Sequence, residues 1–200
     1  MCPGPVRWRS MPVASRRGKA PDEPSEGILN LSRLQAGQMG LAPKTVDLVA
    51  RAEEAVEELR SRAEDQGIRL QLRTEDSAVS AEANGGGVQI VMRDLLPNAV
   101  RHTGDGGHVW IRVRREAERA VLEIAGTSIE MEPEIAGTLF EPFRQASEGM
   151  AREYEGTGLG LAVTQEAVDR VDGSVEVETA KGKGSRFVIR LPRPSAAPSP

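Results

Sequence analysis

The sequence predicts an α+β fold of two layers, in which a mostly antiparallel sheet is covered on one face by helices. Segments with apolar residues at helical spacing occur between segments in which apolar and polar residues alternate one by one. Short charged or glycine-rich turns separate pairs of the alternating segments, as in hairpins of antiparallel strands. Aromatic residues make up 3% of the chain, so Leu, Val, Ile and Ala must fill the core.

The first half of the chain supplies most of the expected helices. Residues 28–39 form a short one that stops at glycines, and a longer helix begins at Val46. Gly67 ends this second helix, because glycine readily adopts the left-handed conformation that follows a helix. The alternating residues 68–72 predict a strand, and Val88 to Arg101 predict a further helix.

The second half of the chain predicts two hairpins and a helix between them. Residues 108–114 and 120–124 alternate and are joined by a charged turn. Residues 159–171 have helical spacing. Two more alternating strands, 174–178 and 186–191, close the domain.

Composition excludes several classes of function. A single cysteine allows neither an intrachain disulfide nor a cysteine zinc site, and two histidines cannot form a histidine-rich metal cage. No window approaches 18 consecutive apolar residues, so we expect no transmembrane segment. The start of the chain lacks the apolar stretch of a secretory signal, and we expect a cytoplasmic protein.

Charge is unevenly distributed along the chain. The net charge is −4, but residues 1–20 hold five basic and no acidic residues, which leaves −9 on the remainder. Because nucleic-acid binding depends on basic residues that meet phosphates, we expect no nucleic-acid partner. The compositions of residues 1–24 and 194–200 predict disordered tails, the first of them basic.

A glycine-rich segment, Gly156–Leu161, lies between a polar stretch and a predicted helix. Glycines allow backbone N–H groups to approach an anion closely, and the helix N-terminus adds a partial positive charge. The segment matches neither a dinucleotide fingerprint nor a Walker loop, since no Gly-Lys-Ser/Thr follows it. It therefore indicates a phosphate site of another kind, or simply a loop that needs glycine for its backbone.

Asp94 and Asn98 form a second candidate site. They are four residues apart, so a helix places both on one face. The Asn98 amide oxygen is suited to Mg²⁺, which prefers oxygen ligands and shares them with phosphates. The alternative is a helix with two exposed polar residues.

In order and spacing, five segments resemble motifs of the ATP-binding domain of bacterial sensor histidine kinases, within the gyrase/Hsp90/histidine kinase/MutL-type ATPase superfamily. Residues 28–192 are covered by the resemblance, which makes 43–193 the ATP-binding domain and 25–42 a remnant of the dimerisation helix. The segments are 28–40, Asp94–Thr103 (the asparagine helix), Leu139–Phe143 (the phenylalanine motif), Gly156–Leu161 (the end of the lid) and Gly182–Phe187 (the last glycine motif).

The resemblance implies a mixed five-stranded sheet under about three helices, with a flexible lid over ATP and Mg²⁺. It implies transfer of the γ-phosphoryl group to a histidine in two-component phosphorelay signalling. Asn98 would bind Mg²⁺, and Ser185 would lie near the base through a water molecule. The residues implied in nucleotide binding are Asn98, Arg101, His102, Gly126, Thr127, Met131, Arg152, Gly156, Thr157, Gly158, Leu159, Gly160, Leu161 and Ser185.

The chain departs from the family pattern in the adenine motif and in the asparagine helix. Gly126 stands where the family has an aspartate that accepts a hydrogen bond from the adenine amine, and Ser128 and Glu130 replace glycines. Loss of a charge-assisted hydrogen bond removes roughly 1.5–3 kcal/mol, which predicts about 10–150-fold weaker ATP binding. Pro97 lies inside the asparagine helix, where it removes one N–H donor and favours a kink.

A phosphoacceptor histidine is also missing. The histidines are His102, within the nucleotide motif, and His108, on a strand. The resemblance therefore implies a phosphoacceptor dimerisation domain supplied in trans or by a missing N-terminal part, a response regulator downstream, and a homodimer through residues 26–40. Two alternatives remain: a pseudokinase or interaction module that does not bind nucleotide, and a stand-alone ATPase. In the ATPase, Asp94 would be the general base.

Overall fold

The computed structural model describes residues 9–12, 44–83, 85–127, 139–141, 160–180 and 184–194. The helix expected over 28–39, with its possible dimer contact through residues 26–40, lies outside the described residues. None of the described helices is long and apolar enough to cross a membrane. The elements are β1 (Arg9–Pro12), β2 (Lys44–Asp47), α2 (Leu48–Asp65), β3 (Arg69–Thr74), β4 (Ser80–Ala83), α3 (Gly85–Arg101), β5 (His108–Glu116), β6 (Arg119–Gly126), α5 (Gly160–Asp169), β7 (Ser174–Ala180) and β8 (Gly184–Pro192).

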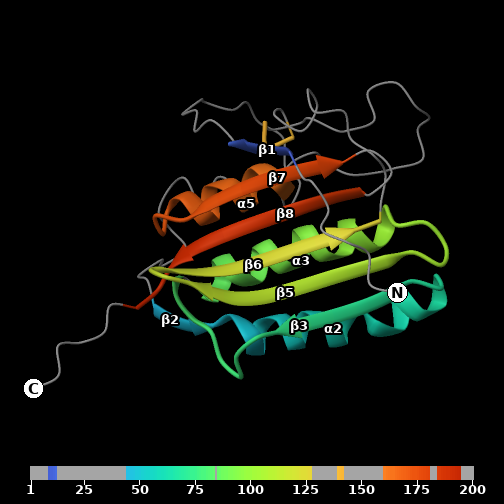
Figure 1. The fold of residues 1–200 in the computed structure, drawn as a ribbon, viewed down its shortest axis with the longest axis horizontal. Coiled ribbons are helices and arrows are strands. Elements are labelled where there is room, and N and C mark those ends of the chain that lie inside the picture. The colour runs from blue at the N-terminus through green and yellow to red at the C-terminus, as the bar shows by residue number, and fades with distance from the viewer. Residues whose placement is uncertain are drawn as a thin grey trace, which may run out of the picture.

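The main sheet is mixed and mostly antiparallel. Its strand order is β1-β7-β8-β6-β5-β3, and β3 and β5 form its parallel pair. Helices α2, α3 and α5 lie together behind the sheet in Figure 1 and cover one of its faces. The strands β7, β8, β6, β5 and β3 with these helices confirm the predicted two-layer α+β sandwich.

Two features of the sheets differ from the expectations. Strand β1 falls within the segment expected to be a disordered tail, and it pairs antiparallel with the edge strand β7. Strands β2 and β4, each four residues long, form a separate two-stranded sheet that the sequence pattern did not indicate. A strand of four residues is too short to show a clear alternation.

The second predicted helix begins later than expected. Val46 and Asp47 belong to β2, and α2 starts at Leu48. Asp47 is its N-cap: the carboxylate accepts hydrogen bonds from the backbone N–H of Val49 at 3.0 Å and of Val79 at 3.2 Å. At the other end, Gly67 follows the cap residue with φ of +63°, which confirms its predicted role in ending the helix.

The core lies between the sheet and the helices. On β5 and β6, alternate apolar residues are buried against the helices, among them Ile111 and Ile124. Leu95, Leu96 and Val100 of α3 are buried in the same cluster, so α3 is anchored along its length. The packing holds the polar residues of α3 at fixed positions above the sheet.

The sheet face away from the helices carries a network of ion pairs, which we call the arginine–glutamate network. It contains two buried carboxylates, Glu123 and Glu178, which are 7% and 4% exposed. Arg186 lies between them, 2.6 Å from Glu178 and 3.5 Å from Glu123, and Arg114 is 2.7 Å from Glu123. Arg190 pairs with Glu176 at 3.0 Å. Buried carboxylates are stable only when paired in this way.

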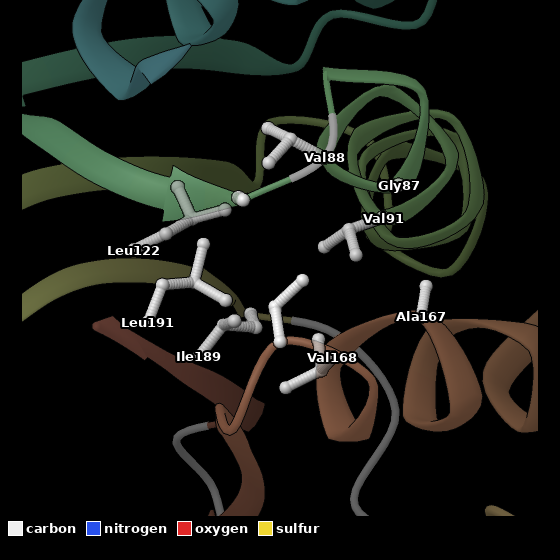
Figure 2. A pocket seen from close by; sticks show the side chains of 10 residues that line it. Gly87, Val88, Val91, Leu122, Ala167, Val168, Ile189 and Leu191 are labelled. Carbon is white, nitrogen blue, oxygen red and sulfur yellow. The ribbon is translucent and has the colours of Figure 1, made fainter. Parts of the chain in front are cut away.

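A small apolar cavity lies where α3 and α5 meet the sheet. Figure 2 shows Val88 and Val91 of α3, Val168 of α5, and Leu122 and Ile189 of the sheet around it. The cavity encloses about 10 Å³, close to the space of one water molecule, and its lining is apolar. Because few polar groups face it and its volume is small, the cavity is an imperfection in packing and not a ligand site.

We predict that Asp47→Ala lowers the free energy of unfolding by about 1–2 kcal/mol, because two backbone N–H groups lose their acceptor. Urea unfolding followed by circular dichroism measures this change. Asp76→Ala is the matched control, since its carboxylate makes an exposed ion pair with Arg115 at 3.2 Å. We expect a change below about 1 kcal/mol there. Equal losses in the two variants would contradict the capping role.

Candidate functional site

Helix α3 presents polar side chains beside its buried apolar residues. Asn98 and His102 lie on it and just after it, and both are half-buried. The backbone N–H of His102 donates to the Asn98 carbonyl at 3.0 Å. Burial, and to a smaller extent the neighbouring positive charge of Arg101, lowers the pKa of the His102 imidazole below its ordinary value. The helix continues past Pro97 to Arg101, so the proline does not end it.

Asp94 faces the start of α5. The first residue of α5 is Gly160, and a Cβ atom placed there would lie 3.3 Å from the Asp94 Cγ. Such a contact is tight, so a glycine allows α5 to begin against the Asp94 carboxyl without displacing it. Thr164 follows one turn later, is fully buried, and its hydroxyl has no hydrogen-bond partner at normal geometry.

The environment of Asp94 changes its protonation. Burial raises the pKa of the Asp94 carboxyl from 3.8 to about 6. The positive charge of Arg93 and the hydroxyl of Thr164 oppose this rise in part. The carboxyl is therefore mostly ionised at pH 7, although burial destabilises its charged form.

A second cluster forms where β6 ends. Gly126 is buried there, and a Cβ atom at this position would lie 3.0 Å from the Thr103 hydroxyl oxygen. Thr103 donates its hydroxyl proton to the Ala99 carbonyl at 2.7 Å. The next residue, Thr127, is hydrogen-bonded to His108 twice: its N–H donates to the His108 carbonyl at 3.0 Å, and its hydroxyl accepts from the His108 N–H at 3.1 Å.

Ser185 completes the second cluster. It lies directly opposite Gly126 in the pairing of β6 with β8. The residue is 4% exposed, and its hydroxyl has no hydrogen-bond partner. Two residues later, the ring of Phe187 meets the ring of Phe140 edge to face, with 6.4 Å between the ring centroids.

The predicted residues that are described fall into three groups. Asn98, Arg101 and His102 lie along α3 and its end; Gly160 and Leu161 begin α5 beside Asp94. Gly126, Thr127 and Ser185 lie at the end of the sheet. Six predicted residues lie outside the described part of the chain: Met131, Arg152, Gly156, Thr157, Gly158 and Leu159.

Two residues of these clusters were not predicted from the sequence. Thr103 closes the motif that begins at Asp94, and its contact with Gly126 depends on how α3 ends above the sheet. Thr164 lies one turn after Gly160, on the face of α5 that packs against α3, and helical spacing alone could have indicated it. In the described residues no three His, Cys, Asp or Glu side chains come together as a metal site.

A sequence profile of the histidine kinase-, DNA gyrase B- and HSP90-like ATPases matches residues 83–195. The chain belongs to this ATPase family. It is 30% identical over 199 residues to the circadian input-output histidine kinase CikA of Synechococcus elongatus, with 94% of this chain and 26% of the relative aligned. It is also 30% identical to the alginate biosynthesis sensor protein KinB of Pseudomonas aeruginosa, over 82% of this chain and 27% of the relative. The chain thus spans about a quarter of the length of these relatives.

Two solved structures share the fold of this chain. Full-length ShkA in complex with AMPPNP matches with a TM-score of 0.74 and 25% identity, over 86% of this chain and 35% of that chain. The mycobacterial sensor histidine kinase MprB matches with a TM-score of 0.64 and 24% identity, over 76% of this chain and 97% of that chain. The region that matches the ATPase profile runs from the end of β4 to beyond β8, so it contains both clusters described above.

We predict that Asp94→Asn stabilises this ATPase domain near neutral pH. The folded-state pKa of Asp94 lies above its ordinary value, so the carboxyl favours folding most at low pH, and this contribution is lost as pH rises through about 6. The neutral amide avoids that loss, and the free energy of unfolding at about pH 7.5 should rise by roughly 1–3 kcal/mol. The difference should shrink below about 1 kcal/mol near pH 4.

Urea unfolding at both pH values measures the effect, and Glu53→Gln on the exposed side of α2 serves as the control. The control should show the same small difference at each pH. An Asp94→Asn variant no more stable than the original protein at about pH 7.5 would contradict the burial of an ionised carboxylate.

Proposed function

We propose that this chain is the ATP-binding catalytic domain of a two-component sensor histidine kinase. In this proposal the γ-phosphoryl group of ATP passes to a histidine supplied by another chain or by a part of the protein outside this sequence. The observation that carries the proposal is the meeting of α3 and α5, where Gly160 begins a helix directly against the helix that bears Asn98. A helix N-terminus is a favourable place for an anion, and an adjacent amide oxygen is a suitable ligand for Mg²⁺.

Phosphate and metal would be held at the α3–α5 end of the site. Asn98 would bind Mg²⁺ through its side-chain oxygen, while Arg101 and His102 would approach phosphate or ribose. Backbone N–H groups of Gly156–Leu161 would bind the phosphates, and Arg152 would balance their charge. The close approach of Gly160 to Asp94, which a side chain would disturb, fits this use of glycine. Bound Mg-ATP would supply the phosphoryl group and a cation that neutralises its charge.

The base would lie at the end of the sheet. Gly126, Thr127, Met131 and Ser185 would surround it, and the unpartnered, buried hydroxyl of Ser185 fits a role in hydrogen bonding to a ligand or to a bound water molecule. The residues of this chain would bind and orient the nucleotide, since phosphoryl transfer depends mainly on positioning and electrostatic stabilisation.

The acceptor histidine would come from a partner. His108 lies on β5, and its ring stacks on the ring of Trp110 with 5.7 Å between the centroids. His102 is half-buried at the end of α3. Both histidines therefore pack against other parts of this domain. We propose a dimerisation domain with a phosphoacceptor histidine, supplied in trans, and a response regulator downstream. The fold neighbour ThkA is described in complex with the response regulator protein TrrA, which supports this class of partner.

We predict that Mg-ATP binds to the chain and that Asn98→Ala weakens binding about 10-fold or more, because a metal ligand is lost. Isothermal titration calorimetry measures both affinities. Gln71→Ala on the exposed edge strand β3 is the control and should bind like the original protein. No heat at saturating Mg-ATP would contradict the proposal and would favour a nucleotide-free interaction module.

A second measurement tests the transfer itself. The chain is mixed with the dimerisation domain of a sensor kinase and with Mg-ATP, and acid-labile phosphohistidine is measured. Phosphohistidine on the dimerisation domain supports the proposal. Release of inorganic phosphate without phosphohistidine, abolished in Asp94→Asn, would instead indicate a stand-alone ATPase.

A further inference from the structure

A row of uncharged residues crosses the end of the sheet and includes Gly126, which lies under Thr103 just after the end of α3. In the strand pairing, Thr179 of β7 lies opposite Ser185 of β8, Ser185 opposite Gly126 of β6, and Gly126 opposite Val109 of β5. All four lie on the sheet face that packs against the helices, since the apolar residues two positions along each strand belong to the core there. We call these four residues the neutral row.

The polar side chains at and above the neutral row carry hydroxyl groups. Ser185 is 4% exposed, and its hydroxyl has no hydrogen-bond partner. Above Gly126, the Thr103 hydroxyl donates its proton to the Ala99 carbonyl at 2.7 Å, which leaves its oxygen lone pairs available. That oxygen lies 3.0 Å from the position of a Cβ atom on Gly126. A buried hydroxyl without a partner is unfavourable, so the site is suited to a ligand that supplies one.

The charged residues of the same strands lie on the other face. Arg186 follows Ser185 in sequence, so its side chain lies on the opposite face of the sheet from the neutral row. On that face it pairs with Glu178 at 2.6 Å. Glu123 is also on that face and is held by Arg114 at 2.7 Å. These carboxylates are bound to arginines across the sheet and are not directed at a ligand above the neutral row.

We propose that the neutral row accepts the edge of a purine without distinguishing an amino group from a carbonyl at position 6. The inference rests on the proposed nucleotide site and specifies its ligand class as purine nucleoside triphosphates in general. A carboxylate can only accept a hydrogen bond, so it would favour an amine and repel a carbonyl oxygen. A serine hydroxyl rotates, and it can accept from the amine or donate to the carbonyl.

The test compares Mg-ATP with Mg-ITP by calorimetry on the full chain, because the bases of these nucleotides differ at position 6 and in the protonation of N1. We expect dissociation constants within about 10-fold of each other. A preference for ATP above about 10-fold would overturn the inference but leave the proposed function intact. Binding of neither nucleotide would overturn both.

Substitutions at Gly126 test whether this position determines the preference between ATP and ITP. Gly126→Asp should create a preference for ATP over ITP of about 10–150-fold, since a charge-assisted hydrogen bond would form with the amine alone. Gly126→Asn is the matched control, because it has the same size and crowds Thr103 equally but can present a donor or an acceptor. Its ratio should stay within about 10-fold. Equal ratios in the aspartate and asparagine variants would contradict the inference.

Ser185→Ala tests the hydroxyl without adding bulk. We expect it to weaken binding of Mg-ATP and Mg-ITP by the same factor, about 2–10-fold, and to leave their ratio unchanged. A role in folding alone would leave both dissociation constants unchanged and lower the unfolding temperature, and that result would contradict recognition by Ser185. A loss confined to one nucleotide would likewise show that the hydroxyl is not used in both directions.

Discussion

The burial of α3 between the sheet and the neighbouring helices is the constraint on which the described structure depends. Leu95, Leu96 and Val100 are buried in the core, which leaves Asp94 and Asn98 at the margins of the contact. Because a helix is rigid, the residues on its margins keep fixed positions relative to one another. The end of α3 then places Thr103 over Gly126, so the same helix connects the start of α5 with the end of the sheet.

The start of α5 beside Asp94 and the end of the sheet at Gly126 differ in their electrostatics. At the α5 end, Asp94 holds a partly buried negative charge whose pKa is raised to about 6 by burial. At the end of the sheet, Thr103, Ser185 and Gly126 provide hydroxyls and backbone without a charge. An anionic ligand would be repelled by Asp94 unless a cation balanced it, whereas an uncharged ring at the other end would meet no such opposition. A nucleotide with its metal ion combines these two properties.

Much of the fold could be predicted from the sequence, because its strands alternate clearly and its helices carry regular apolar positions. The pattern from Val88 to Arg101 predicted α3 correctly, although three glycines extend it to Gly85. Short elements could not be predicted: β2 and β4 have four residues each, and their pairing depends on contacts distant in sequence. The composition of residues 1–24 predicts a disordered tail because it offers too little apolar area to bury, and composition alone does not register that Arg9–Pro12 can pair with an available strand edge.

The candidate site could be predicted only in part. Spacing predicts that Asp94 and Asn98 lie on one face of a helix, and the resemblance to sensor kinases predicts that Gly126 and Ser185 belong to one site. That Ser185 lies opposite Gly126 with its hydroxyl unpartnered follows from strand register, which a single sequence does not specify. The raised pKa of Asp94 depends on desolvation by the packing of α5, and this is a tertiary effect.

The arginine–glutamate network has a consequence for how the chain reaches this arrangement. Side chains alternate between the faces of a strand, so a shift of β8 by one residue would turn Arg186 and Arg190 into the apolar layer and Ile189 out of it. Their guanidinium groups would then lose the ion pairs with Glu178 and Glu176 and would be buried away from solvent. Burying unpaired guanidinium groups is strongly unfavourable, so a pairing shifted by one residue is much less stable than the observed one. Charge on the outer face thereby protects the alignment of Ser185 with Gly126 on the inner one.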